Sequence, residues 1–262
     1  MREPRHLERI DWAPNTVRPP DLSSWPYTIP AIAQIIRHGG LEIPPGVTFL
    51  VGENGSGKST LLEAIADIYP RGGHETPYAA VTGPSSSVED SPLRWHLRPR
   101  LHRFASPAGF FLRAEAMHSF LFGVDARPLE ARAWGGETLQ ERSHGESFLA
   151  VLRHRFDEQG VYFLDEPEAA LSVHSCLSLL SLLNTMRKEG SQILIATHSP
   201  LLASLPGATL LELEETGIRT ARSFEELNLV RHWRSFLGEP ARYFRHLFAE
   251  FGDSNADEST DD

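Results

Sequence analysis

Hydrophobic residues along this chain gather in short runs that alternate with helix-like patterns. The apolar runs, typical of buried parallel strands, lie at 47–51, 109–112, 161–164 and 193–196. Apolar residues at helical spacing follow at 59–68, 146–156 and 168–188. Strands that alternate with helices indicate crossover connections around a parallel sheet. The pattern therefore predicts an α/β fold with a central, mostly parallel sheet flanked by helices.

The remaining segments predict how this fold begins and is interrupted. Residues 1–24 contain four prolines and little periodicity, so we expect them to cross the surface before a first strand near 27–35. A stretch rich in Gly, Pro and Ser, at about 71–108, predicts a long irregular insertion.

The C-terminal part of the chain predicts a hairpin, a helix and a tail. Residues 209–215 and 217–220 indicate the hairpin, and Ser223 with Glu226 could form a capping box that opens a terminal helix. Residues 253–262 carry five acids and no large apolar side chain, which predicts a disordered acidic tail. We therefore expect one domain over 1–252.

Composition places the chain among ordinary globular proteins, with 40% hydrophobic and 23% charged residues in 262. The single cysteine, Cys176, lies in a helix-like stretch and is interpreted as a buried structural thiol. The sequence has neither the apolar segment of a secretory signal nor a run of about 18 apolar residues for a membrane span. We therefore expect a cytoplasmic protein.

A formal charge of −10 argues against a dedicated nucleic-acid surface, because it repels phosphate backbones at a distance. A basic cluster nevertheless consists of Arg94, His96, Arg98, Arg100, His102 and Arg103. A solvated loop rich in Pro and Arg is its plain interpretation, and a local nucleic-acid patch is the alternative.

The strongest chemical signal is the segment GENGSGKST at 52–60, which satisfies the G-x-x-x-x-G-K-[ST] pattern between a strand and a helix. Glycines allow backbone N–H groups to point at phosphate oxygens, and the helix N-terminus adds its positive dipole. The predicted nucleotide-binding residues here are Gly52, Glu53, Asn54, Gly55, Ser56, Gly57, Lys58, Ser59 and Thr60. Lys58 is expected on the β and γ phosphates and Ser59 on Mg²⁺.

Two adjacent acids, Asp165 and Glu166, end the apolar run at 161–164. Ligands of such sheets bind beyond the carboxyl ends of the strands, so Asp165 is expected to face Mg²⁺. Glu166 could polarise an attacking water. His198 follows the run at 193–196 at the same edge, where its imidazole could contact the γ-phosphate. Lys58, Glu166 and His198 are thus the candidate catalytic residues.

The segment SHGES at 143–147 has two compatible interpretations. Ser143 and Glu146 form a capping box, and Gly145 would allow a γ-phosphate to approach the helix N-terminus, including one held by a second copy of the chain. Ser143 and Gly145 are therefore candidate nucleotide ligands.

Taken in order, GENGSGKST, SHGES, VYFLDEPEAALS and IATHSP resemble the Walker A, signature, Walker B with D-loop, and H-loop motifs of ABC-type ATPases. With GFFLRAE at 109–115, the chain is similar to small stand-alone bacterial predicted ATPases of the AAA-domain type over about 27–248. The resemblance implies ATP and Mg²⁺ as ligands and a head-to-tail homodimer that closes on two ATP molecules. Ser143 and Gly145 of one subunit would then complete the site of Lys58, Asp165 and Glu166 in the other.

The chain departs from transporter ATPases at several motif positions. Its signature reads Ser-His-Gly-Glu where they carry LSGGQ, and its D-loop ends in Ser172 where they have aspartate. Glu115 is our substitute for the Q-loop glutamine, with a simple strand-end acid as the alternative. Tyr27 could stack on adenine or could be a core aromatic on the first strand.

The sequence favours an ATP-hydrolysing engine coupled to an unidentified protein partner. An ATP-regulated binding module with negligible turnover is the alternative, although Glu166 speaks against it. A small-molecule kinase would have no evident use for His198 and Ser143. A link to DNA stays possible but unsupported, since the interval from Lys58 to Ser143 is too short and Pro-rich for a long coiled coil.

Overall fold

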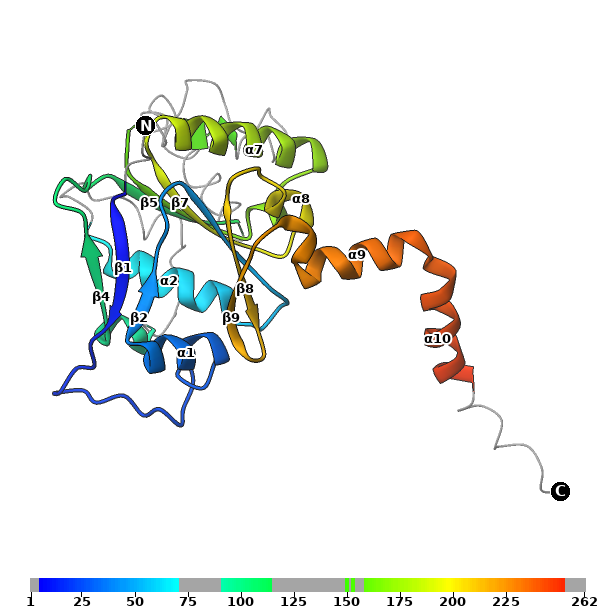
Figure 1. The fold of residues 1–262 in the computed structure, drawn as a ribbon, viewed down its shortest axis with the longest axis horizontal. Helices are drawn as coiled ribbons and strands as arrows, with labels where there is room; N and C mark the ends of the chain where they lie inside the picture. The colour runs from blue at the N-terminus through cyan, green and yellow to red at the C-terminus, as the bar shows by residue number, and fades with distance from the viewer. Residues whose placement is uncertain (1–4, 71–90, 115–148, 151, 154–157, 253–262) are drawn as a thin grey trace, which may run out of the picture.

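The computed structural model describes residues 5–70, 91–114, 149–150, 152–153 and 158–252. At its centre is a six-stranded sheet with the order β5-β6-β7-β3-β8-β9 (Figure 1). Its strands are β3 (Val47–Val51), β5 (Gly109–Arg113), β6 (Val161–Asp165), β7 (Gln192–Thr197), β8 (Thr209–Glu214) and β9 (Gly217–Ala221). All neighbours pair in parallel except β8 and β9, which form an antiparallel hairpin. The predicted α/β class, the four central strands and the hairpin are confirmed.

Alternation along the central strands divides the core into two layers. In β3, Val47, Phe49 and Val51 belong to one apolar cluster and Leu50 belongs to the other. The first cluster packs against α7 (Val173–Lys188) and α8 (Pro200–Ala203). The second packs against α1 (Pro30–His38) and α2 (Lys58–Ile68) on the opposite face of the sheet (Figure 1). Every residue of β3 and β6 is buried, as expected for strands covered on both faces.

The N-terminal segment contains a strand at 7–12, so the prediction that residues 1–24 cross the surface before the first strand is wrong there. Strand β1 (Leu7–Trp12) pairs antiparallel with β2 (Gly40–Glu42) and β4 (Leu97–Leu101) in a second, three-stranded sheet. Leu7 and Ile10 are fully buried in it. Ion pairs cross between the strands at the more exposed positions, from Asp11 of β1 to Arg100 of β4 and from Arg9 of β1 to Glu42 of β2. Such long-range partners are invisible in a short window of sequence.

The strand predicted near 27–35 is also wrong, because these residues lead into helix α1 (Pro30–His38). Pro30 occupies the first turn, where its missing N–H costs nothing. Ala31, Ile32 and Ile35 are buried at helical spacing. Gly39 ends the helix in a left-handed conformation with φ of 69°.

The predicted irregular insertion is partly wrong. Residues 71–90 lie outside the described part of the chain, whereas 91–108 contain a 3-10 turn, η1 (Pro92–Trp95), and strand β4. The basic cluster is therefore no simple solvated loop: its arginines at 98 and 100 lie on a strand, and His96 is buried against Trp12 and Tyr27.

The helix predicted at 168–188 begins later, because Pro167–Ala170 form a 3-10 turn, η3, and Ser172 caps α7 by accepting from the Ser175 amide at 3.2 Å. Cys176 is buried in α7, as predicted, and burial raises the pKa of its thiol. Of the helix predicted at 146–156, only 149–150 and 152–153 are described, and they are helical.

The chain ends in two helices that project from the body, α9 (Asn228–Gly238) and α10 (Pro240–Gly252) (Figure 1). The predicted capping box is wrong: Ser223 makes no side-chain cap, and residues 224–226 form a separate 3-10 turn, η4 (Phe224–Glu226). Glu226 Oε2 instead accepts from the Arg222 amide at 3.0 Å. The predicted acidic tail, 253–262, lies outside the described residues.

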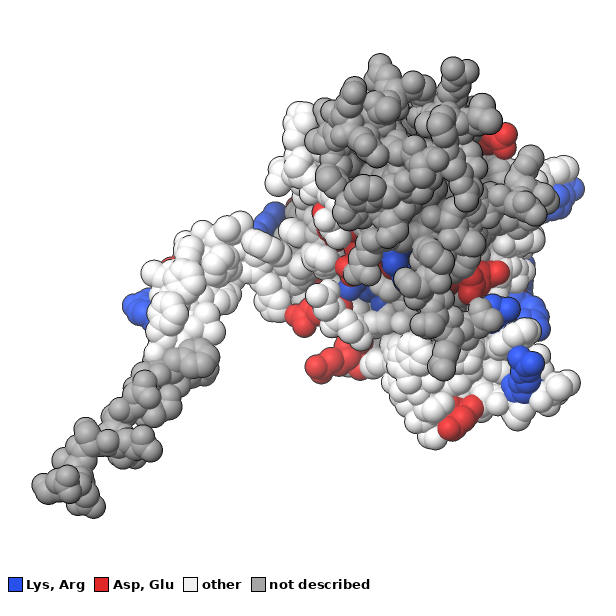
Figure 2. Space-filling view, turned by 180° about the vertical axis from the view of Figure 1, so that it is seen from behind, with Lys and Arg blue, Asp and Glu red and all other residues white. Residues whose placement is uncertain are grey.

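Membrane-spanning helices and the distribution of surface charge can both be assessed for the described residues. Among the described residues, no helix is both long and apolar enough to cross a membrane. Seen from behind, Lys and Arg side chains are interspersed with Asp and Glu over the described part of that face (Figure 2). This part of the surface therefore presents no stripe of a single charge of the kind that nucleic-acid grooves carry.

Candidate functional site

The loop between β3 and α2 has, at two positions, a backbone conformation that favours glycine. Gly55 and Gly57 have φ of 83° and 92°, in the left-handed region. A Cβ on Gly57 would meet Ile29 Cγ2 at 2.5 Å, and one on Gly52 would meet the Leu213 carbonyl oxygen at 2.8 Å. The loop is thus held in one conformation between Ile29, which precedes α1, and Leu213 of β8.

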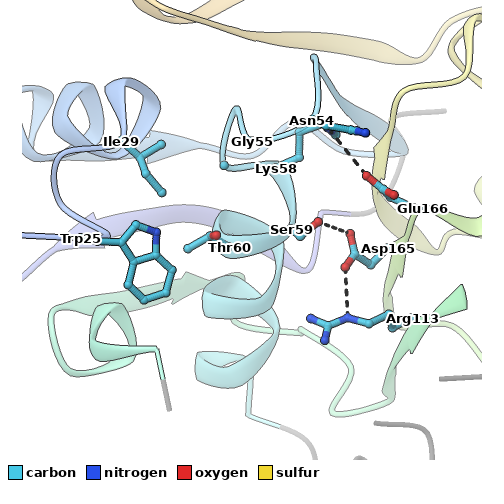
Figure 3. Close-up of a pocket in the computed structure, with 11 residues that line it drawn as sticks. Trp25, Ile29, Asn54, Gly55, Lys58, Ser59, Thr60, Arg113, Asp165 and Glu166 are labelled. Carbon is cyan, nitrogen blue, oxygen red and sulfur yellow. Dashed lines mark hydrogen bonds and ion pairs between the residues drawn. The ribbon is translucent and has the colours of Figure 1, made fainter. Parts of the chain in front are cut away.

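Lys58 lies inside this loop. Its side chain is only 3% exposed, and its Nζ donates to the Glu53 carbonyl at 2.9 Å. The same Nζ lies 3.8 Å from Glu166 Oε1, across the site (Figure 3). Burial lowers the pKa of the Lys58 ammonium, and the neighbouring carboxylates of Glu166, Asp165 and Glu168 oppose that shift. An ammonium held in this way is available to a polyanion that enters the loop.

Ser59 and Asp165 meet across the site, as the sequence predicts. Ser59 Oγ donates to Asp165 Oδ1 at 2.8 Å. Asp165 is buried at the carboxyl end of β6, and burial raises the pKa of its carboxyl against the hydrogen bond from Ser59. These two groups supply hydroxyl and carboxylate oxygens, which are ligands that Mg²⁺ prefers. The described residues hold no cluster of three or more His, Cys, Asp or Glu metal ligands. Ser59 and Asp165 fit an ion such as Mg²⁺, which usually keeps several waters and binds substrate phosphates.

Arg113 is a site residue that sequence reasoning missed. The pairing of β5 with β6 sets Arg113 opposite Asp165, and Arg113 Nε donates to Asp165 Oδ2 at 3.3 Å. Arg113 also forms an ion pair with Glu63 of α2. The sequence showed that Arg113 follows a predicted strand. It did not show that this strand pairs with the strand that ends at Asp165.

Glu166 has a strained backbone. It is the only non-glycine residue with positive φ in the described part of the chain, at φ 47° and ψ 50°. Its amide donates to the Ala196 carbonyl at 2.9 Å, which fixes the turn against β7. Such a conformation costs about 1–3 kcal/mol and persists where the surroundings enforce it, often in active sites.

His198 lies at the same sheet edge, immediately after β7. Its Nδ1 is 3.5 Å from Glu166 Oε1 and 3.6 Å from Glu168 Oε1. That nitrogen is buried and has no hydrogen-bond partner among the described residues. The predicted neighbourhood of His198 and Glu166 is therefore present.

A cavity of about 510 Å³ opens between the glycine-rich loop and the end of β6, and His198 is not among its lining residues. It is lined by Trp25, Ile29, Asn54, Gly55, Gly57, Lys58, Ser59, Thr60, Arg113, Asp165 and Glu166 (Figure 3). Trp25 and Ile29 form one wall, and the two acids with Arg113 form the other (Figure 3). Gly52, Glu53 and Ser56, also predicted as ligands, line a second cavity of about 560 Å³, which shares Asn54 and Gly55 with the first.

The aromatic side chain in the first cavity is Trp25, whereas the sequence offered Tyr27 as a candidate for adenine stacking or for the core. Tyr27 is 4% exposed and packs edge-on against Trp12, so its core interpretation is correct. Trp25 is 62% exposed beside the loop. The sequence signal for Trp25 was that it is a second aromatic residue, two positions before Tyr27. Ser143, Gly145 and Glu115 lie outside the described residues.

Comparison with known proteins gives matches at two levels. A family profile described as "AAA domain" matches residues 31–68, and one described as "AAA domain, putative AbiEii toxin, Type IV TA system" matches residues 146–204. The chain is 30% identical over 216 residues to a hemin import ATP-binding protein of Burkholderia lata, covering 69% of this chain and 79% of that protein. It is 32% identical over 206 residues to the corresponding protein of Burkholderia thailandensis, covering 65% and 75%.

Other relatives are longer than this chain. A xylose import ATP-binding protein of Moorella thermoacetica is 24% identical over 166 residues, which are 57% of this chain and 33% of that protein. The chain thus spans about a third of the length of the sugar import relatives that it matches. A solved structure of a metal-chelate type ABC transporter aligns over 91% of this chain and 90% of the transporter chain, with 12% identity and a TM-score of 0.48.

Proposed function

This chain belongs to the ATP-binding proteins of the ABC type, and on that premise we propose that it hydrolyses ATP with Mg²⁺ as two copies close and reopen. The observation that carries the proposal is the meeting of two distant segments. Lys58 and Ser59 leave the glycine-rich loop, and Asp165 and Glu166 leave β6. Ser59 Oγ lies 2.8 Å from Asp165 Oδ1, and Lys58 Nζ lies 3.8 Å from Glu166 Oε1.

In this proposal, Lys58 and the loop amides hold the triphosphate. The loop lies at the N-terminus of α2, where the helix dipole favours anions. On ATP binding, the Lys58 ammonium would exchange its carbonyl partner, Glu53, for phosphate oxygens. Ser59 and Asp165 would hold Mg²⁺, which when bound neutralises charge that develops on the phosphates.

Glu166 and His198 would act on the γ-phosphate end. Glu166 would accept a hydrogen bond from the attacking water and orient it in line with the phosphorus. His198, whose Nδ1 lies 3.5 Å from Glu166 Oε1, would contact the γ-phosphate and distinguish ATP from ADP. Both side chains belong to turns that are anchored on β7, which limits their freedom before the substrate arrives.

We place the adenine against Trp25. An exposed indole on the cavity wall offers a flat apolar face. Stacking of a base on an aromatic side chain stabilises binding and tolerates any of the bases. Tyr27 has no access to the cavity, because it is buried in the core.

A second copy of the chain would close the cavity from the open side. Ser143 and Gly145 of that copy would contact the γ-phosphate that Lys58 holds. Because ATP would touch both copies only in the closed state, binding would favour closure and hydrolysis would release it. Relatives named as import ATP-binding proteins suggest an output through a separate partner protein.

The proposal is tested with wild type, Glu166→Gln, Lys58→Ala and the surface control Lys188→Ala. We expect Mg²⁺-dependent ATP hydrolysis in wild type and Lys188→Ala, and none in Lys58→Ala, which should also lose ATP binding in calorimetry. Glu166→Gln should bind ATP and keep a dimer mass in light scattering.

Two results would contradict parts of this proposal. If Glu166→Gln and wild type bind ATP and neither turns it over, the chain is a nucleotide-regulated binding module. If Glu166→Gln stays a monomer at saturating ATP, the role of Ser143 and Gly145 in a second copy fails. A duplex DNA arm in the same assay tests the remaining possibility that nucleic acid stimulates turnover.

A further inference from the structure

Glu168 joins the turn that carries Glu166 to the segment that carries His198. It belongs to the 3-10 turn η3, two residues after Glu166. Its Oε1 accepts from Thr197 Oγ1 at 2.5 Å and from the His198 amide at 2.9 Å. One carboxylate oxygen thus receives two donors from consecutive residues at the end of β7.

The hydrogen bonds continue beyond this pair. Thr197 Oγ1 in turn accepts from the Ser199 amide at 3.0 Å. Together these bonds fix the backbone on both sides of His198, so its Nδ1 lies 3.6 Å from Glu168 Oε1 and 3.5 Å from Glu166 Oε1. Backbone pairing does not supply this restraint, because β7 ends at Thr197.

The contact is shielded from water. The Glu168 side chain is 9% exposed, and its Oε2 is buried with no hydrogen-bond partner among the described residues. Hydrogen bonds to an ionised carboxylate are roughly twice as strong as neutral ones, and low exposure strengthens them further. A buried carboxylate with one unused oxygen costs free energy, which the two hydrogen bonds donated to Oε1 offset.

We propose that Glu168 is a positioning residue that holds His198 beside Glu166, a proposal that rests on the function proposed above. Glu168 itself does not line the nucleotide cavity. It acts through His198, and therefore its removal should matter only while His198 is present.

A double-mutant cycle on Glu168 and His198 tests this dependence. Glu168→Ala should lower kcat by about 10- to 100-fold, the effect expected of a misplaced catalytic group, and leave the KM for ATP within about threefold. In the His198→Ala background the same change should alter kcat by less than about twofold. Glu168→Gln keeps an oxygen acceptor and should retain about a third or more of wild-type kcat.

Additive losses in the cycle, or a Glu168→Ala enzyme as active as wild type, overturn the proposal. If Glu168→Ala does not fold, the cycle is run with Thr197→Val, which removes one of the two donors, and with Thr197→Ser as the matched control that keeps it. Thr197→Val should lower kcat by about fivefold, again only when His198 is present.

An NMR measurement separates this proposal from the proposed function. The His198 imidazole signal, identified by its loss in His198→Ala, should shift in Glu168→Ala and stay in place in Glu168→Gln. This comparison needs no turnover. Absence of hydrolysis in wild type would refute the proposed function, whereas an unmoved His198 signal in Glu168→Ala would refute the positioning role.

Discussion

Adding one methyl group to the phosphate loop should destabilise the protein by an amount that depends on which glycine receives it. Gly57 and Gly55 are matched positions, because both have positive φ, at 92° and 83°. They differ in their surroundings: a Cβ on Gly57 meets Ile29 Cγ2 at 2.5 Å, whereas a Cβ on Gly55 meets nothing within 4 Å.

The expected magnitudes follow from two separate costs. A left-handed backbone costs a non-glycine residue about 1–2 kcal/mol, and both variants incur it. The overlap with Ile29 forces repacking, which costs about 1–3 kcal/mol in a filled interior, and only Gly57→Ala incurs it. Gly55→Ala should therefore lower the free energy of unfolding by about 1–2 kcal/mol. Gly57→Ala should lower it by about 2–5 kcal/mol.

The assay is urea unfolding without nucleotide, followed by fluorescence and circular dichroism together. The difference between the two variants is the informative quantity, because changes in the unfolded chain on replacing Gly by Ala are common to both. In an Ile29→Ala background, Gly57→Ala should cost no more than Gly55→Ala does, since Ile29 Cγ2 is gone.

Equal losses in the two variants would refute the role given to Ile29. An excess loss that persists in the Ile29→Ala background would do the same, and would place the cost in the backbone alone. Because Ile29 directly precedes α1, such a result would also remove the argument that the start of this helix fixes the loop.

The remaining predictions concern the nucleotide base and a buried acid. Trp25→Ala should raise the Kd for ATP by about 5- to 150-fold, since base stacking contributes about 1–3 kcal/mol. It should leave the Kd for tripolyphosphate unchanged. Trp25→Phe is the control, and calorimetry is the measurement. Burial raises the pKa of Glu212 above its ordinary 4.5. The free energy of unfolding of the wild type should therefore fall, relative to that of Glu212→Gln, as pH rises from about 4.5 through that raised pKa. If the urea midpoints of the two proteins change in parallel across this range, the shift is contradicted.

Local sequence predicted the parts of the site that lie within single motifs. The strand before Gly52 and the helix that begins at Lys58 follow from an apolar run, a glycine-rich turn and an amphipathic run, all within about twenty residues. Asp165 and His198 were likewise found at the ends of apolar runs. The rule that parallel strands present their carboxyl ends at one edge brings these residues together without coordinates.

Interactions between distant segments were not predictable in this way. Strand β1 was missed because its partners, β2 and β4, lie about 30 and 90 residues away. Trp25 and Tyr27 are two positions apart in one aromatic-containing turn, and only packing decides that Tyr27 enters the core while Trp25 faces the cavity. The helix at 30–38 was mistaken for a strand because short apolar runs suit both elements.

The amino-acid sequence by itself determined the α/β class, the phosphate loop and the acids at the end of β6, because each depends on neighbouring residues and on the hydrophobic period. Tertiary structure alone decided the register that brings Arg113 to Asp165 and the turn that brings Glu168 to His198. The physical reason is that a hydrogen bond or ion pair needs its atoms within a few ångströms. Folding of the whole sheet, and no local pattern, sets those distances.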